Sequence, residues 1–581
     1  MEILKGIPVS PGVYIGEAFL QESEEVRIPN LHVLEELVDS ELKRFDEAVQ
    51  RVIVDIDEIR KKTEEQLGSS LGAILSVQTQ LLKDASLLKQ IKDKIKNERF
   101  TAEHAVATTL KNFAKRLASY GGPVFSQRGS DIYDLQKRLL RALLGERRED
   151  LSHLERPVAL IAHDLGPSQT ASLDRTKVRG FAIDVGGRTS HTAILARAFE
   201  MPAVVGLETI STDVSGGETV IIDGNRGIVI LRPDERTLAR YRKLQQEFQT
   251  FEQSLIKDKD LPAVTLDGRE IRVQANIELP DEVEGALAHG AGGIGLFRTE
   301  FLYLTSGIVP DENTHFDAYR KSITKLSGKP LVIRTLDLGA DKIIPGLESH
   351  ERNPFLGLRS IRVSMKYPET FRTQIRAILK ASTLGKVRLM VPMITNLEEL
   401  RWARRIVDET KQELAREGQS FDNKIEVGIM VEVPSAALQA HVLAKEADFF
   451  SIGTNDLIQY TLAVDRGNEL VANLYSGGNP AVLQLISLTM DAAQKANIPV
   501  SMCGEMAGDR LFTTTLVGMG LTDLSMSPPS IPEIKKIIRT VKYEKCKDIA
   551  KQVLAMTETN AILDFLRQRL SEDLPGGEKF G

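Results

Sequence analysis

The chain has 581 residues, with 75 Lys and Arg against 81 Asp and Glu, which gives a formal net charge of −6. This length is large for one packed core and predicts about two to four domains. With 42% hydrophobic and 27% charged residues, the composition is typical of a globular protein and excludes disordered and fibrous classes. The mild negative charge gives no reason to expect nucleic acid as a partner.

Two further features of the sequence concern location and thiol chemistry. No stretch approaches the roughly 20 consecutive apolar residues of a membrane span, and the first ten residues lack the basic start and apolar run of a signal peptide. We therefore expect a cytoplasmic protein that is not inserted in a membrane. Cys503 and Cys546 are too few for a disulfide framework, so each is expected to be a free thiol.

The first part of the chain combines an extended segment with a helical block. Residues 6–20 carry the Pro, Gly and β-branched residues of strand and turn. From Val38 onward, apolar residues recur at spacings of three and four, which predicts a helix with one apolar face. Its apolar positions are Leu42, Phe45, Val49, Val52, Ile56 and Ile59. Looser patterns of the same kind cover residues 73–94, 102–120 and 131–144, and together they predict an inserted α-helical bundle. The alternative is a charged helical spacer without chemistry of its own.

The second part, residues 154–231, predicts a small α/β unit. Gly and polar turns separate short β-rich runs at residues 157–163, 180–185, 202–207 and 219–231. A charged helical pattern then covers residues 234–259 and ends at Leu261-Pro262, which predicts an interdomain linker.

The third part, from residue 262, carries eight strand-like runs with amphipathic helical stretches between most of them. These runs cover residues 271–277, 292–298, 330–337, 386–394, 425–433, 449–456, 499–505 and 521–527. Eight βα units over this length predict a TIM barrel, whose chemistry lies at the C-terminal strand ends. The polar residues at those ends are Arg298, Arg334, Asp337, Glu432, Asn455, Asp456, Cys503 and Ser525. Cationic, acidic and thiol groups on one rim favour a site for an anionic, metal-bound substrate.

A loop in the second part carries the chain's most suggestive histidine. Gly186 and Gly187 allow an unusual backbone path, and Thr189 or Ser190 can cap a helix that begins near His191. A phosphoryl group on this imidazole would face a helix N-terminus, which favours anions. Considered alone, His191 is more simply a helix-starting histidine with local hydrogen bonds.

Long motifs occur in order over nearly the whole chain. They are DLGPSQTASL, GGRTSHTAILAR, GLFRTEFLY, RTLDLGADK, NPFLGLRSIR, GIMVEVPSA, FFSIGTNDLIQYTLAVDR and MCGEMAGD. This series resembles the Enzyme I family of the sugar phosphotransferase system, the phosphoenolpyruvate-protein phosphotransferases. The resemblance implies that the phosphoryl group of phosphoenolpyruvate passes to His191 and then to a histidine of the carrier protein HPr, with release of pyruvate.

The resemblance also implies a domain plan. It is a multidomain α/β protein in which residues 1–20 and 148–231 form a swivelling phosphohistidine domain, and residues 21–147 form an α-helical insertion that binds HPr. Residues 232–261 form a helical linker. Residues 262–581 form a TIM barrel that binds phosphoenolpyruvate and through which the family forms homodimers.

The same resemblance implies the substrate contacts. Arg298 and Arg334 match the positions that bind the phosphate and carboxylate, a task that suits the guanidinium fork. Arg466 matches a third contact to the phosphate, Arg359 adds to the same positive field, and Asn455 matches a further substrate-binding position. Considered alone, each arginine is more often an exposed surface charge.

The metal and proton chemistry is implied in the same way. Glu432 and Asp456 match the Mg²⁺ ligands, and Asp456 also belongs to the substrate-binding set; for Glu432 a structural salt bridge is the alternative. Cys503 matches the general acid that protonates the enolate of pyruvate, although a buried inert thiol is the usual role of a cysteine. Thr170 matches a residue that contacts the active histidine in its resting position.

Two other classes of protein compete with this interpretation. Pyruvate phosphate dikinases and phosphoenolpyruvate synthases share the histidine loop and the barrel, but they need an ATP-binding domain of a few hundred residues and this sequence has no GxxxxGKS or GxxxxGKT motif. A non-catalytic phosphocarrier on an inactive barrel is the other alternative. The intact set of Arg298, Arg334, Glu432, Asp456 and Cys503 argues against it.

Overall fold

The computed structural model divides into two compact units, one over Met1–Phe251 and the other over Glu252–Glu578. Within the described residues, no helix combines the length and the apolar composition that a bilayer crossing requires. The structure describes residues 1–10, 12–21, 31–67, 79, 82, 84–119, 123–144, 156–165, 174, 176–186, 196, 201–306, 309–339, 353–466, 468 and 470–573.

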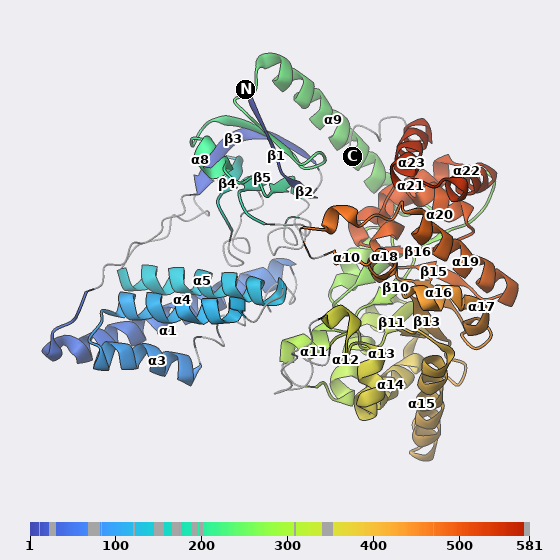
Figure 1. The fold of residues 1–581 in the computed structure, drawn as a ribbon, viewed down its shortest axis with the longest axis horizontal. Coiled ribbons are helices and arrows are strands. Elements are labelled where there is room, and N and C mark those ends of the chain that lie inside the picture. The colour runs from blue at the N-terminus through green and yellow to red at the C-terminus, as the bar shows by residue number, and fades with distance from the viewer. Residues whose placement is uncertain are drawn as a thin grey trace. The chain divides into compact units, whose positions relative to one another are not determined.

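Helices in the first unit pack around one apolar core (Figure 1). They are α1 (Val38–Leu67), α3 (Ala85–Asn97), α4 (Ala102–Ser119) and α5 (Pro123–Leu144). Of the apolar positions predicted for α1, Phe45, Val49, Val52 and Ile56 are buried in this core, which confirms the prediction there. The predicted start of the last helix at residue 131 is wrong, because α5 begins at Pro123, a position where proline is compatible with a helix. Residues 73–78 of another predicted helix lie outside the described residues.

The rest of the first unit is built on an eight-stranded mixed sheet. Its order is β1-β8-β7-β3-β4-β5-β6-β2, with β3 to β6 parallel and the other pairs antiparallel. Separate apolar clusters include alternate residues of β4, as expected for a strand buried on both faces. The strands are β1 (Glu2–Lys5), β2 (Ile7–Ser10), β3 (Val13–Gln21), β4 (Val158–Ala162), β5 (Val178–Ile183), β6 (Ala203–Val205), β7 (Thr219–Asp223) and β8 (Ile228–Leu231).

Helix α9 (Glu235–Asp258) confirms the helix predicted at residues 234–259. Its first half packs on the sheet through Tyr241, which is 1% exposed. The Tyr241 hydroxyl donates to Asp223 Oδ2 at 3.3 Å. At the other end of the helix, Lys536 of α21 (Ile531–Thr540) donates to Ser254 Oγ at 2.7 Å within the second unit.

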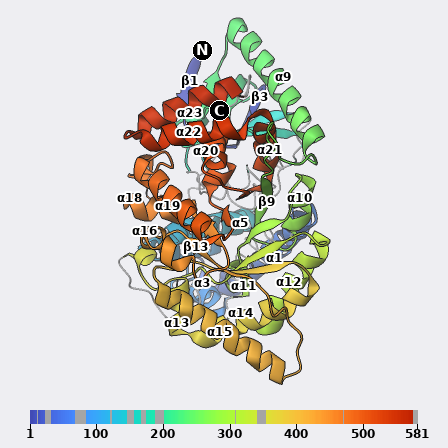
Figure 2. The same cartoon turned by 90° about the vertical axis from the view of Figure 1, so that its right-hand side faces the viewer.

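The second unit is a closed barrel of eight parallel strands, as predicted (Figures 1 and 2). The barrel interior holds a cluster that includes Leu296, Met390, Phe449 and Cys503. Each predicted strand run contains one barrel strand. The strands are β9 (Arg272–Ile277), β10 (Ile294–Phe297), β11 (Leu331–Arg334), β12 (Val387–Val391), β13 (Val427–Val431), β14 (Phe450–Ile452), β15 (Val500–Met502) and β16 (Asp523–Met526).

Amphipathic helices surround the barrel strands. The inner side of α14 (Pro368–Ala381) buries Phe371 and Ile375, while Arg372 lies on its outer side and bonds to Glu413 of α15 (Leu397–Arg416) at 2.7 Å. The other barrel helices include α10 (Glu282–Ala288), α11 (Phe301–Ser306), α12 (Glu312–Leu326), α13 (Ile361–Lys366), α16 (Pro434–Leu438), α17 (Ala440–Leu443), α18 (Thr454–Leu462), α19 (Pro480–Ala496), α20 (Thr513–Gly518), α22 (Tyr543–Ala555) and α23 (Thr559–Asp573).

Candidate active site

Arg334 is the centre of a buried ion cluster at the C-terminal end of β11. It is 9% exposed, its Nη2 donates to Glu300 Oε1 at 2.8 Å, and its Nη1 lies 3.0 Å from Asp337 Oδ2. Burial works against the charged guanidinium, but Glu300 and Asp337 raise the pKa of Arg334 above its usual value. Its Nε has no hydrogen-bond partner among the described residues. A permanently charged donor with spare bonding capacity suits an anionic ligand.

Arg359 joins the same cluster from the segment before α13. Its Nη2 donates to both oxygens of Asp337, at 3.1 and 3.2 Å, and to Asp456 Oδ2 at 3.2 Å. Asp337 is therefore shared by two guanidinium groups. Burial opposes the charge on Asp337, yet Arg334 and Arg359 hold the pKa of this carboxyl below its usual range. The sequence placed Asp337 at a strand end without a role, and the structure gives it a central position.

Three acids from separate strand ends converge beside these arginines. Single carboxylate oxygens of Asp337, Glu432 and Asp456 lie within 4.8 Å of one another. Glu432 is 2% exposed, and its Oε1 accepts from Met393 N at 2.6 Å. Burial and the other two acids raise the pKa of Glu432 well above its usual value. A Cβ added at Gly453 would lie 2.7 Å from Glu432 Oε2, so the backbone leaves room only for glycine here. This hard-oxygen donor set fits a divalent cation such as Mg²⁺.

The remaining predicted substrate ligands are more exposed. Arg298, directly after β10, bonds to Glu278 at 2.7 Å and has a side chain that is 33% exposed. Arg466 is 42% exposed and lies 3.6 Å from Glu505 Oε1. Asn455, at the start of α18, accepts from Glu505 N at 2.9 Å. Exposed carboxylate partners are weakly held, so an anionic ligand can displace them.

Cys503 follows β15 and is 2% exposed. Ser451 Oγ donates to its sulfur at 3.2 Å, and Asn276 Nδ2 donates to its backbone oxygen at 2.8 Å. Burial raises the pKa of the thiol to about 11, against the opposing effects of Ser451 and Arg334. The thiol is therefore protonated at neutral pH and has a proton to donate. Cys546 is fully buried within helix α22.

Of the predicted site residues, His191 and Thr170 lie outside the described residues. The described ends of β4 and β5 hold a polar pair that the sequence interpretation missed. His163 Nδ1 lies 2.9 Å from Asp184 Oδ2, and Ser211 N donates to Asp184 Oδ1 at 3.0 Å. The available signal was a polar residue directly after each of two parallel strands. Glu300 was missed similarly, although it lies inside the motif GLFRTEFLY.

Comparison with known proteins agrees with this fold. Sequence profiles of phosphoenolpyruvate-utilising enzymes match three parts of the chain, namely the N-terminal region at residues 5–128, the mobile domain at 154–227 and the phosphoenolpyruvate-binding domain at 252–543. The closed barrel with arginines and acids at its C-terminal strand ends is thus that of a phosphoenolpyruvate-utilising enzyme.

Full-length relatives narrow this class. The phosphoenolpyruvate-protein phosphotransferase of Bacillus sp. (strain S) is 42% identical over 98% of both chains. Those of Bacillus subtilis and Haemophilus influenzae are 40% and 39% identical over 98% of this chain and 100% of their own. The chain belongs to the phosphoenolpyruvate-protein phosphotransferase family. This membership does not favour the dikinase, synthase or non-catalytic carrier alternatives.

Proposed function

We propose that this chain transfers the phosphoryl group of phosphoenolpyruvate to its own His191 and then to a histidine of HPr, as the first step of the sugar phosphotransferase system. One observation carries the proposal. In a chain of this family, Arg334, Arg359 and three acids meet in a buried cluster at the C-terminal end of a barrel. Such a cluster offers both anion donors and metal ligands to one substrate.

The substrate is bound by arginines and the metal ligands. Arg298, Arg334 and Arg466 bind phosphate and carboxylate oxygens, with Arg359 adding positive charge and Asn455 a polar contact. Glu432 and Asp456 would hold Mg²⁺. The position of Asp337 suits either a third metal ligand or an anchor for both buried arginines. When bound, Mg²⁺ neutralises charge on the substrate oxygens.

The chemistry needs one bond broken, one formed and one proton supplied. The neutral imidazole of His191 attacks phosphorus, a P–N bond forms, and the bond from phosphorus to the enol oxygen breaks. The pyruvate enolate that leaves takes a proton on its methylene carbon from the Cys503 thiol. Arg334 lowers the pKa of Cys503 and so stabilises the thiolate until water reprotonates it.

The first unit delivers the phosphoryl group. We assign residues 1–20 and 148–231 to the phosphohistidine domain, with Thr170 holding His191 at rest, and residues 21–147 to the surface that binds HPr. Movement about the linker at residues 232–261 takes His191 from phosphoenolpyruvate to HPr. A cytoplasmic location stays a prediction from the sequence.

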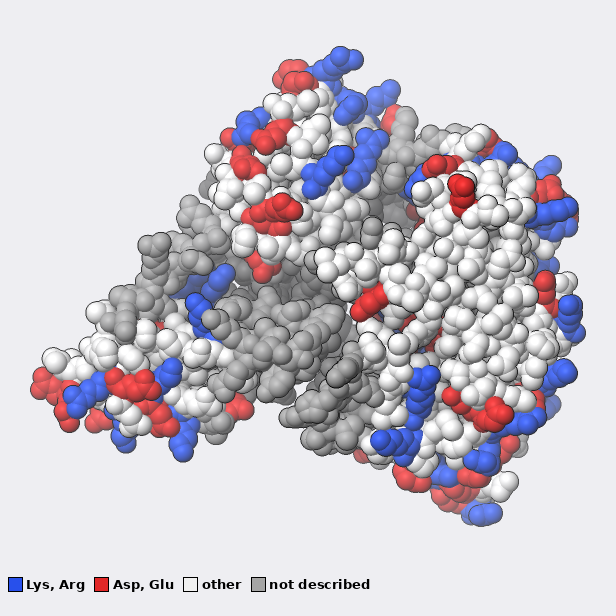
Figure 3. Space-filling view, viewed as in Figure 1, with Lys and Arg blue, Asp and Glu red and all other residues white. Residues whose placement is uncertain are grey.

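We also propose a homodimer formed through the barrel. The barrel face in Figure 3, over α16, α17 and α19, carries few charged side chains. Leu438 of α16 and Leu488 of α19 are 61% and 45% exposed. An apolar, charge-poor surface is typical of homodimer interfaces. Sedimentation of the full chain with and without Mg²⁺ and phosphoenolpyruvate tests it.

The central test uses phosphoenolpyruvate labelled in its phosphoryl group, together with Mg²⁺ and HPr. The unaltered protein should acquire an acid-labile label and pass it to HPr, with pyruvate released. His191→Ala should acquire none, whereas His289→Ala, which changes a partly exposed histidine directly after α10, should behave as the unaltered protein does. Acid-labile label on His191→Ala would overturn the assignment, and pyruvate formation that requires a nucleotide would revive the dikinase alternative.

A further inference from the structure

Gln374 of α14 is a fully buried amide that links three parts of the barrel. Its Oε1 accepts from the backbone N of Leu336 at 3.0 Å, just after β11. Its Nε2 donates to Thr299 Oγ1 at 3.0 Å, in the segment after β10, and to the Tyr319 hydroxyl of α12 at 3.2 Å. One side chain thus bonds to the ends of two adjacent strands and to a covering helix.

The orientation of this amide is fixed by its partners. The Leu336 N–H can only donate, so it must face the carbonyl oxygen, and the amide nitrogen must face Thr299 and Tyr319. Thr299, having accepted this bond, donates its hydroxyl hydrogen to the backbone oxygen of Arg334 at 3.0 Å. A reversed amide would leave buried donors facing each other, which costs free energy.

The other branch of the network runs from Tyr319 to His315 and Tyr303. Tyr319 accepts from Gln374 and donates to His315 Nδ1 at 3.1 Å, and His315 Nε2 lies 3.3 Å from the Tyr303 hydroxyl. Burial lowers the pKa of His315 to about 4, so the ring is neutral at pH 7 and has an acceptor nitrogen for Tyr319. Each hydroxyl and ring nitrogen of this branch therefore has a partner, which makes the buried network a firm support for Gln374.

The bonded backbone atoms lie next to the proposed substrate arginines. Thr299 follows Arg298 and precedes Glu300, which pairs with Arg334, while Leu336 lies between Arg334 and Asp337. The hydrogen bond from the Thr299 hydroxyl to the Arg334 backbone oxygen joins the ends of β10 and β11, and Gln374 holds that hydroxyl in place. A shift of Gln374 would therefore change the separation of Arg298 and Arg334.

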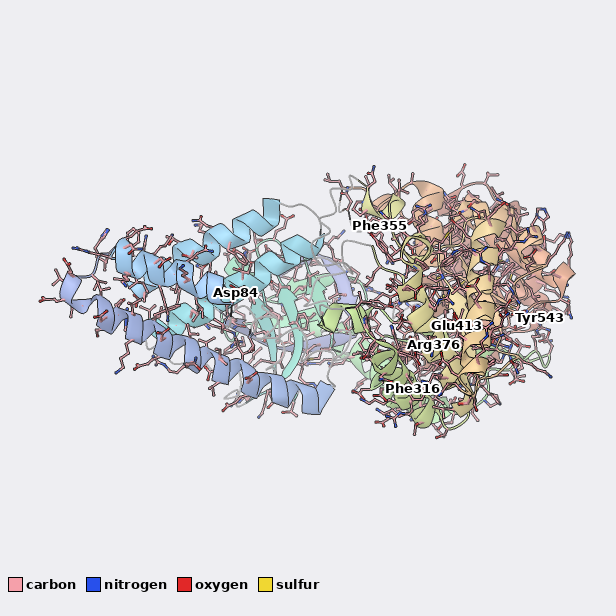
Figure 4. All side chains as sticks on the ribbon, turned by 90° about the horizontal axis from the view of Figure 1, so that it is seen from below. Asp84, Phe316, Phe355, Arg376, Glu413 and Tyr543 are labelled. Carbon is pink, nitrogen blue, oxygen red and sulfur yellow. The ribbon has the colours of Figure 1, made fainter. Side chains whose placement is uncertain are left out.

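Helix α14 is itself held firmly from its outer side. Figure 4 labels Arg376 of this helix and Glu413 of α15, whose charged groups lie 3.7 Å apart. Arg376 also bonds to Glu417, directly after α15, and to Glu312 of α12 at 2.7 Å. Gln374 thus extends inward from a helix that ion pairs hold on two sides.

We propose that Gln374 is a positioning residue that, through Thr299, sets the spacing of Arg298 and Arg334. The proposal rests on the function proposed above, since that function gives both arginines the same substrate. Gln374 acts from outside the site, because its own hydrogen bonds all go to buried protein groups. Well-supported binding groups are needed because small displacements reduce rates strongly.

The test compares Thr299→Val and Gln374→Met with the matched control Thr410→Val in the full-length protein. Thr410 is as fully buried as Thr299, but within the described part of the chain its hydroxyl bonds to Ile406 O of its own helix, at 2.6 Å. The first two variants should raise the KM for phosphoenolpyruvate about tenfold or more. Their phosphorylated forms, made at saturating phosphoenolpyruvate, should pass the label to HPr at the unaltered rate. Thr410→Val should leave both quantities unchanged.

A conservative variant separates positioning from folding. Thr299→Ser keeps the hydroxyl and should restore the KM, and Gln374→Met decides the matter if Thr299→Val does not fold by circular dichroism. The proposal is overturned if folded Thr299→Val or Gln374→Met keeps the original KM, or if Thr410→Val raises it equally. If the unaltered protein forms no pyruvate from phosphoenolpyruvate, the proposed function itself has failed, which is a different result.

Discussion

The sheet of the first unit and the barrel of the second bury different kinds of side chain. Strands β4 and β5 bury Leu160, Ile161 and Phe181 among other apolar residues. Among the described residues of this sheet and its connections, Asp184 and Asp223 are buried carboxylates, and backbone amides donate to both. The barrel instead buries a connected set of opposite charges at its strand ends.

This contrast separates stability from function. Buried apolar area stabilises a fold without specifying any chemistry, whereas buried charges cost free energy unless they are paired and hydrogen-bonded. The sheet therefore resembles a frame, and a functional histidine on one of its loops stays a prediction from the sequence. The barrel places charged groups in fixed positions before substrate arrives, which is the arrangement that electrostatic catalysis requires.

Arg334→Met should produce the largest effect, because it removes the cation that two buried acids share. Turnover of phosphoenolpyruvate should fall about a thousandfold. The free energy of unfolding of the barrel should fall by about 3 to 5 kcal/mol, since Glu300 and Asp337 lose a buried partner. Pyruvate release and urea unfolding measure the two effects.

The control for Arg334 is an exposed arginine of the same barrel. Arg401 is 62% exposed and bonds to Glu446 on the helical surface. Arg401→Met should change neither turnover nor unfolding to a measurable degree, because exposed ion pairs contribute little. Equal effects of the two substitutions would mean that the buried cluster has no special role.

Phe181→Ala should affect the first unit alone. Phe181 is fully buried in β5, and its truncation should lower the unfolding free energy of that unit by about 3 to 5 kcal/mol through loss of buried area and a cavity. Phe371→Ala in α14 is the reciprocal variant for the barrel. Calorimetry should show one transition moving in each variant. If a single substitution shifted both unfolding transitions, the two units would not unfold independently.

The barrel was predictable from sequence because buried parallel strands are continuous apolar runs, such as Val427–Val431, with a polar residue at one end. The partners of those polar residues were not predictable. Thr299 and Gln374 are 75 positions apart, and no local pattern says that their side chains meet. Likewise, Glu432 is held by the backbone of Met393, whose φ of 56° has no signal in a one-letter code.

In the first unit, too, the positions of the buried helix residues could be predicted from the sequence. The spacing of Phe45, Val49, Val52 and Ile56 placed them on one face, and all are buried. The start of α5 was missed because Gly129 and Ser130 interrupt the pattern, although Pro123 marks the true first turn. The role of His191 stays a prediction.

Cys503→Ala tests whether the barrel site donates a proton as well as binding charge. The kcat for pyruvate formation should fall about a hundredfold with little change in KM, because the thiol is the proposed acid and makes no proposed contact to phosphate. Cys546→Ala removes the other buried thiol and should leave the kcat unchanged. Unchanged turnover of Cys503→Ala would exclude the acid role.

The smallest effects come from two carboxylates with similar partners and opposite pKa shifts. Asp267, near the start of the barrel, is exposed and accepts from Thr265 Oγ1 and from the first backbone amides of α22 at 2.7 and 3.2 Å. These bonds lower the pKa of Asp267 to about 2. Asp223 in the sheet also accepts backbone amides, but burial dominates and raises the pKa of its carboxyl.

The two shifts predict opposite slopes of stability with pH. The folded pKa of Asp267 lies below its unfolded value of about 4, so its contribution is complete above that pH and is lost as pH falls toward 2. The folded pKa of Asp223 lies above that value, so ionisation opposes folding as pH rises above about 4. Urea midpoints measured from pH 3 to 7 test both slopes. Asp267→Asn should be less stable than the unaltered protein at pH 7, and this difference should shrink as the pH falls. Asp223→Asn should become more stable relative to the unaltered protein as the pH rises. If the stability differences of the two variants changed with pH in the same direction, burial would not distinguish the carboxylate of the first unit from that of the second.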